Sequence, residues 1–149
     1  MARTPGAAEI PGLLIYRFSG PLFFANASRF RSRVEELVQT SPDPVAHVII
    51  DASGMTDLDL SGVEMLDELR NGLRARGVSL ALADPFGPFR DALARGGLLN
   101  TLGADGLFPT VAEAVHARQV AGTGVRDSVM RRPTADVGRA RASDGPTSP

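Results

Sequence analysis

The chain has 149 residues, 43% of them hydrophobic and 5% aromatic. This length and composition suit one domain of ordinary size, and the chain is too short for two. Its formal net charge of -1 and pI near 6.1 provide no general basic character of the kind that nucleic-acid binding uses. Because the chain contains no cysteine, a disulfide framework, a thiolate zinc site and a cysteine nucleophile are excluded.

The first part of the chain predicts two strands and a helix. Residues 13–18 (LLIYRF) and 21–25 (PLFFA) are apolar runs separated by the turn sequence Ser19-Gly20-Pro21, so we expect a β-hairpin at the N-terminal edge of a sheet. Residues 28–38 predict an amphipathic helix, because apolar side chains recur there at helical spacing. These side chains are Phe30, Val34, Leu37 and Val38.

Strands and helices alternate in the central part. The nearly continuous apolar run at residues 45–50 predicts a strand buried on both faces. A leucine stripe after Ser61 predicts a second amphipathic helix, which Gly77 ends. The later elements are expected to be a strand at 78–83, a short helix to Arg95, a strand at 106–108 and a helix from the Thr110 capping box to about Arg118.

The two ends of the chain are expected to be disordered. Residues 119–149 contain no Leu, Ile, Phe, Tyr or Trp, so they bury too little apolar surface to offset the loss of chain entropy. Residues 1–9 (MARTPGAAE) contain no apolar run. We therefore predict a single domain at residues 10–118, between a disordered N-terminal segment and a disordered C-terminal tail.

The order of elements indicates an α/β fold, with a mixed β-sheet, an N-terminal hairpin and about four helices packed mainly on one side. The sequence resembles a STAS domain, and more narrowly the C-terminal cytoplasmic STAS domain of a bacterial SulP-type (sulfate permease family) anion transporter. Residues 11–27 (PGLLIYRFSGPLFFANA) are similar to the transporter branch, whereas DLSG at residues 59–62 is shared with the anti-sigma-factor antagonists. The matching segments are residues 10–34, 48–69, 77–98 and 107–115.

The resemblance implies a non-catalytic regulatory or scaffolding domain of an inner-membrane transporter for sulfate or a related anion. Its partner would be the transmembrane domain of the parent transporter, at the cytoplasmic face of the membrane, and a homodimer through the parent is compatible with this. The first twelve residues lack the apolar region of a signal peptide, and no apolar run reaches about eighteen residues, so the chain alone is expected to be soluble. The alternative is a free-standing anti-sigma-factor antagonist that is switched by phosphorylation of Ser61.

Ser61 has both a structural and a functional interpretation. With Glu64 three residues later it forms a capping-box pattern, so its hydroxyl is expected to cap the helix, an interaction worth about 1 kcal/mol. The antagonist resemblance implies that the same serine is a phosphoacceptor. A phosphate there would meet the negative charges of Asp57, Asp59 and Glu64, so phosphorylation would alter partner binding through repulsion.

A ligand would be expected beyond the carboxyl ends of the strands, at the loops of residues 52–61 and 84–88. Helix N-termini at Gly62 and Pro88, with Arg90 nearby, offer amides and a cation to a phosphate. The STAS resemblance implies a guanine nucleotide, GDP or GTP, although ordinary surface loops would have the same sequence. The candidate residues for a nucleotide or partner are Asp57, Asp59, Ser61, Gly62, Phe86, Gly87 and Arg90.

No other pattern points to a cofactor or a reaction. The acidic residues of the serine loop lack the spacing of a calcium-binding EF-hand, and His47 and His116 have no second ligand nearby in the sequence. There is no GxSxG elbow and no P-loop lysine, because the chain contains no lysine at all. We therefore expect no metal site and no enzymatic activity.

Overall fold

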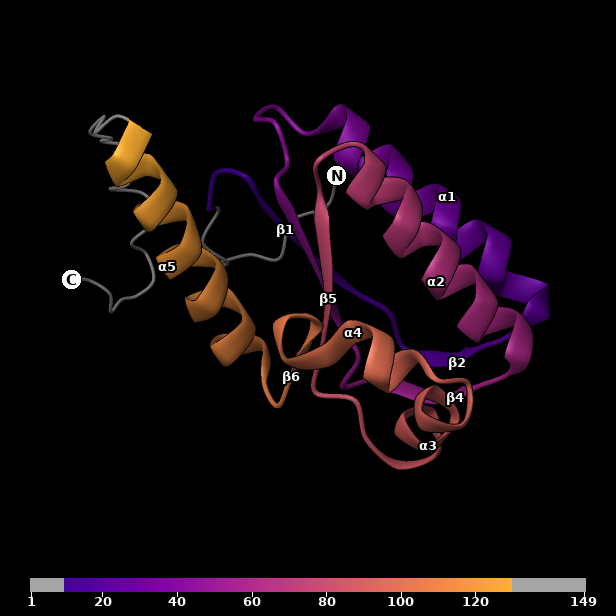
Figure 1. The fold of residues 1–149 in the computed structure, drawn as a ribbon. Helices are drawn as coiled ribbons and strands as arrows, with labels where there is room; N and C mark the ends of the chain where they lie inside the picture. Colours follow the sequence, from indigo (N-terminus) through magenta and orange to yellow (C-terminus); the bar gives the residue numbers. More distant parts are fainter. Residues whose placement is uncertain (1–9, 130–149) are drawn as a thin grey trace.

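The computed structural model describes residues 10–129 (Figure 1). Its strands are β1 (Leu13–Arg17), β2 (Gly20–Leu22), β3 (His47–Asp51), β4 (Met55–Leu58), β5 (Ser79–Ala83) and β6 (Leu107–Phe108). Its helices are α1 (Phe24–Thr40), α2 (Leu60–Ala75), α3 (Gly87–Arg95), α4 (Leu98–Gly106) and α5 (Val111–Val129). The predicted α/β class is confirmed.

The main sheet has four strands in the order β1-β3-β5-β6, and every neighbouring pair is parallel. In register, Arg17 lies opposite Asp51, which lies opposite Ala83. A mixed sheet was expected, but parallel pairing follows from the helical crossovers that separate β1, β3 and β5. As a result, the carboxyl ends of these strands meet at one edge, where ligands of α/β sheets usually bind.

The predicted N-terminal hairpin is wrong. β2 does not return along β1 but pairs in parallel with β4, in a separate two-stranded sheet. Gly20, with a φ of 103°, turns the chain, and its N–H donates to the Gly54 carbonyl oxygen at 2.8 Å. The pairing places Leu22 fully inside the core. Burial of this side chain favours the pairing with β4. The turn sequence alone predicts a hairpin, because it contains no information about the distant strand β4.

Two further elements differ from the prediction at this end. α1 begins at Phe24, so the second half of the predicted PLFFA strand is helical. β4 lies in what was expected to be a loop, with Met55 and Leu58 buried and the two residues between them exposed. Strands this short cannot be distinguished from loops by periodicity.

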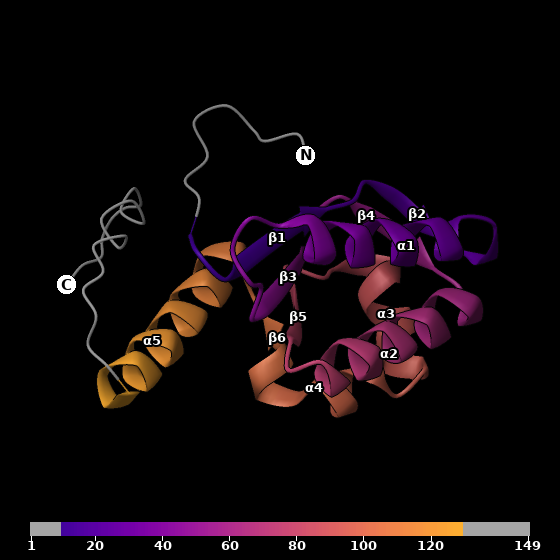
Figure 2. The ribbon, with the colours of Figure 1, turned by 90° about the horizontal axis from the view of Figure 1, so that it is seen from above.

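Helices cover both faces of the main sheet, but unequally (Figures 1 and 2). α1 and α2 lie side by side on one face and share the larger core with residues of α3 and α4, whereas α5 lies on the opposite face. The side chains of β3 alternate accordingly: Val48 and Ile50 belong to the larger core, and Ile49 packs with Ala83 and Ala114 under α5. This confirms the prediction of a strand buried on both faces and of helices mainly on one side.

The C-terminal part contains more helix than expected. α4 was not predicted, and it begins after Gly97, whose φ of 80° breaks the chain away from α3. α5 runs to Val129, past its predicted end near Arg118, so the first part of the expected tail is helical. The expectations for residues 1–9 and 130–149 lie outside the described residues. No helix within residues 10–129 is both long enough and apolar enough to cross a bilayer.

Candidate functional site

The N-terminus of α2 is capped by Asp59, so the predicted capping role of Ser61 is wrong. Asp59 is extended, and its Oδ1 accepts a hydrogen bond from the Gly62 N–H at 2.8 Å. Buried Leu58 ends β4 directly before it, so the helix begins at Leu60 and Ser61 already lies in its first turn. Asp caps a helix as well as Ser does, so local sequence preference could not choose between the two residues.

The same carboxylate also holds the start of α1. Its Oδ2 accepts the Phe24 N–H at 3.1 Å, and both helices direct the positive ends of their dipoles toward it. Asn26 completes this junction, because its Oδ1 accepts the Phe23 N–H and its Nδ2 donates to the Pro21 carbonyl, both at 2.9 Å. Asp59 therefore joins the N-termini of α1 and α2, a role that its place among candidate ligand residues did not suggest.

Gly62 is required by packing. A Cβ at this position would lie 2.6 Å from Leu58 Cδ1 and 2.9 Å from the Leu22 carbonyl oxygen. The absence of a side chain thus allows α2 to approach the β2 backbone closely. Because the Gly62 N–H is bonded to Asp59, this amide is not free to bind a phosphate, contrary to the sequence expectation.

Phe86, Gly87 and Arg90 lie in a different place, at the junction of β5 and α3. Asp84 and Gly87 have positive φ values, 61° and 57°, which turn the chain sharply between the strand and the helix. This turn leaves Phe86 49% exposed as the residue before α3, and Arg90 is exposed within the helix.

The predicted site residues therefore form two groups. Asp57, Asp59, Ser61 and Gly62 lie at the β4–α2 junction, and Phe86, Gly87 and Arg90 at the β5–α3 junction. Within the described part of the chain, no hydrogen bond or ion pair links the two groups. Helix α3 packs against β4, so the junctions belong to neighbouring elements at the same end of the fold (Figure 1).

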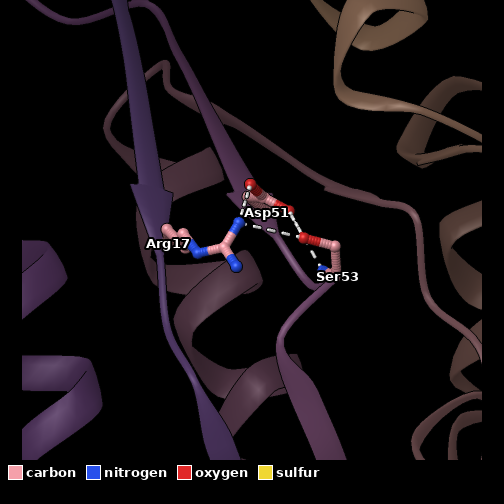
Figure 3. Close-up of polar contacts among 3 residues, drawn as sticks. All are labelled: Arg17, Asp51 and Ser53. Atoms are coloured by element: carbon pink, nitrogen blue, oxygen red, sulfur yellow. Dashed lines mark hydrogen bonds and ion pairs between the residues drawn. The ribbon is translucent and has the colours of Figure 1, made fainter. Parts of the chain in front are cut away.

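A polar cluster that the sequence analysis missed lies at the carboxyl ends of β1 and β3 (Figure 3). Arg17 Nη1 lies 3.3 Å from Asp51 Oδ2 and donates to Ser53 Oγ at 3.1 Å. Ser53 donates from its hydroxyl and its N–H to Asp51 Oδ1, at 2.7 and 3.0 Å. Arg17 is largely exposed, so the cluster fixes the turn after β3 more than it contributes stability. The sequence did contain a signal for this cluster, because an Arg and an Asp each end one of two adjacent strands.

His47 lies at the beginning of β3, away from both groups. Its Nδ1 is 2.7 Å from Ser79 Oγ on β5. Burial and the nearby Arg118 guanidinium on α5 both lower the pKa of His47 below 6.5. Arg118 itself stacks on the Phe108 ring, 5.5 Å from its centroid, and donates to the Asp105 carbonyl oxygen. His47 is therefore part of the contact between α5 and the sheet. Among the residues described, no three His, Asp or Glu side chains are grouped to hold a metal ion.

The lowered pKa of His47 predicts a specific pH dependence of stability. The unfolded chain binds the proton near pH 6.5, before the folded protein does, so the free energy of unfolding falls as the pH drops through this value. We expect His47→Gln to remove this component. Urea unfolding from about pH 7.5 to about pH 5.5 should therefore show a smaller loss of stability for the variant than for the wild type. Parallel pH curves for the two proteins would contradict the prediction.

Comparison with known proteins identifies relatives of the whole fold. The family model described as "STAS domain" matches residues 4–114. A probable sulfate transporter of Mycobacterium tuberculosis, Rv1739c, is 37% identical over 113 residues, which are 76% of this chain and 20% of the relative. The structure of the murine Slc26a9 anion transporter in the inward-facing state superposes with a TM-score of 0.65 at 29% identity, covering 76% of this chain and 19% of that one. The chain thus spans about a fifth of these relatives.

A third structure bears on the alternative interpretation. A putative anti-sigma-factor antagonist of Thermotoga maritima matches with a TM-score of 0.60 at 16% identity, over 72% of this chain and 88% of that one. At this identity the match shows a shared fold and no more. The higher identity to sulfate transporters agrees with the transporter-like N-terminal segment.

Proposed function

The chain belongs to the STAS domain family, and from this premise we propose that it is the regulatory, non-catalytic domain of a SulP-type anion transporter. The observation that carries the proposal is the 37% identity to a segment that makes up 20% of a probable sulfate transporter. In this proposal the domain lies at the cytoplasmic face of the membrane, and its partner is the transmembrane part of the same transporter.

Uptake of radiolabelled sulfate by cells that produce the transporter tests this function. Removal of residues 10–129 should lower uptake while an epitope tag shows that the membrane part remains in the membrane. Unchanged uptake at equal protein level would show that the domain does not regulate or support transport.

A guanine nucleotide is the candidate ligand of this domain. The half-exposed Phe86 ring can stack on a base. The first turn of α3, in which Pro88 has no N–H, offers the Gly87 and Phe89 amides to the phosphates, and the Arg90 guanidinium follows them in sequence. Calorimetric titration with GDP and GTP should then give heat that Phe86→Ser and Arg90→Ala abolish. Arg95→Ala, an exposed arginine on the same helix, is the matched control. No heat from the wild type at millimolar nucleotide would refute nucleotide binding and leave the transporter assignment intact.

The antagonist alternative makes a different prediction for Ser61. Ser61 is partly exposed in the first turn of α2, two residues after the capping Asp59. If the chain were an antagonist, its cognate serine kinase would label this residue, and Ser61→Ala would remain unlabelled. In the proposed transporter role, labelling at Ser61 is not required for sulfate uptake, so Ser61→Ala should transport like the wild type.

A further inference from the structure

Two large apolar side chains are exposed at the first positions of α1 and α2. Phe24 is 73% exposed and Leu60 is 67% exposed, and each is the first residue of its helix. Asp59 links the two positions, because it directly precedes Leu60 in the chain and its carboxylate accepts the Phe24 N–H. The Phe23 ring contacts Phe24 edge to face, with centroids 5.8 Å apart, and so stiffens the exposed ring.

The fold does not need these side chains to be apolar. Neither belongs to a core cluster of the described residues, and both are mostly exposed to solvent. Midway along the two helices the contact between them is polar, since Arg31 of α1 pairs with Glu68 of α2 at 3.1 Å. Large apolar side chains that stay exposed on ordered helices are candidate contacts for a partner.

The charged residues nearest to the pair in the sequence are acidic. Asp57 and Glu64 are exposed on either side of Leu60 in the sequence, and neither forms an ion pair within residues 10–120. The first turn of each helix contains no arginine. We call Phe24, Leu60, Asp57, Asp59 and Glu64 the Phe24–Leu60 surface. Acidic residues thus flank the apolar positions of this surface in the sequence.

This charge decides which kind of partner fits. Anionic lipid headgroups attract basic surfaces, so an acidic border disfavours a membrane surface. Two copies of the chain that met symmetrically through this surface would bring the same carboxylates together. A protein surface that combines apolar side chains with Lys or Arg is complementary. Cytoplasmic loops of membrane proteins carry such an excess of Lys and Arg.

We infer that the Phe24–Leu60 surface docks on the basic cytoplasmic loops of the transporter's membrane part. The inference rests on the proposed function, and it adds which face of the domain makes the contact. Phe24 and Leu60 supply the apolar anchor, Asp57 and Glu64 pair with basic residues of the loops, and Asp59 keeps the two anchors together.

Binding to a defined membrane part tests the inference. The probe is the Mycobacterium tuberculosis relative without its matched 113-residue segment, embedded in nanodiscs, and the analyte is the 149-residue chain. The double variant Phe24→Gln/Leu60→Gln should bind at least about tenfold more weakly than the wild type. Glu64→Arg should also weaken binding, and added salt should weaken binding of the wild type.

Matched control variants show whether a loss of binding is specific to the Phe24–Leu60 surface. Val120→Gln removes an apolar side chain that is 56% exposed on α5, and Glu113→Arg reverses an exposed charge there, so both should bind like the wild type. Urea midpoints should show that all variants fold.

Each of the other outcomes would contradict a specific part of the inference. Undiminished binding by the double variant would refute this surface and leave the proposed function standing, whereas no binding by the folded wild type would count against both. Equal binding to protein-free vesicles of phosphatidylethanolamine and phosphatidylglycerol would show that the surface contacts lipid instead.

Discussion

Asp59→Ala should lower the free energy of unfolding by about 2 kcal/mol, because it removes caps from two helices at once. Oδ1 accepts the Gly62 N–H of α2 at 2.8 Å and Oδ2 accepts the Phe24 N–H of α1 at 3.1 Å. One helix cap contributes typically about 1 kcal/mol, and both bonds here are assisted by the carboxylate charge. The exposed edge of the junction limits the total, since Asp59 is only partly buried. Urea unfolding at pH 7 measures the change.

Two control variants separate the contributions of the two hydrogen bonds of Asp59 and test whether Ser61 contributes to the cap. Asn caps helices as well as Asp does, but its amide nitrogen cannot accept the second N–H, so Asp59→Asn should lose about half as much stability as Asp59→Ala. Ser61→Ala should leave stability nearly unchanged, because the structure places Ser61 inside the first turn. A larger loss from Ser61→Ala than from Asp59→Ala would restore the serine as the cap and contradict the described junction.

Gly62→Ala should destabilise the domain by about 1–3 kcal/mol through overpacking. The Leu58 side chain could move away from an added methyl group, but the Leu22 carbonyl oxygen, 2.9 Å from it, belongs to the backbone of β2. The helix would have to shift away from β2, which would also strain the bond from Asp59. Thermal or urea unfolding should report the loss.

Gly72→Ala is the matched control on the same helix. A Cβ at Gly72 meets nothing within 4 Å, so the substitution should stabilise the protein by roughly 0.5–1 kcal/mol through helix propensity. Opposite signs at the two glycines are therefore expected. Stabilisation by both substitutions would show that α2 does not approach β2 as closely as described.

Much of the fold could be predicted because its elements have clear periodic patterns. The stripe of α1 and the apolar run of β3 each follow from burial, which the structure bears out with Phe30, Val34 and Ile49 inside. Errors arose where the deciding contact is distant in sequence. The turn after β1 looks like a hairpin locally, but Leu22 is buried by pairing with Leu58 of β4.

The site was predicted less well than the fold for a similar reason. The loops at the carboxyl ends of the strands were found, since the order of strands and helices places them there. Sequence order could not show that Asp59 reaches across to Phe24, or that Arg17 meets Ser53. Nor could it show that two apolar residues remain exposed, because Phe24 and Leu60 look like core residues until the helices are placed.

The size and cellular location of the protein that carries this domain test most directly whether the domain belongs to a transporter. An antibody raised against residues 10–129 should detect, in the membrane fraction of the source cells, a band several times larger than the 15.7 kDa of this chain. This size is expected because the chain spans only 20% of the mycobacterial relative. A single band near 15.7 kDa in the soluble fraction would contradict the assignment to a transporter.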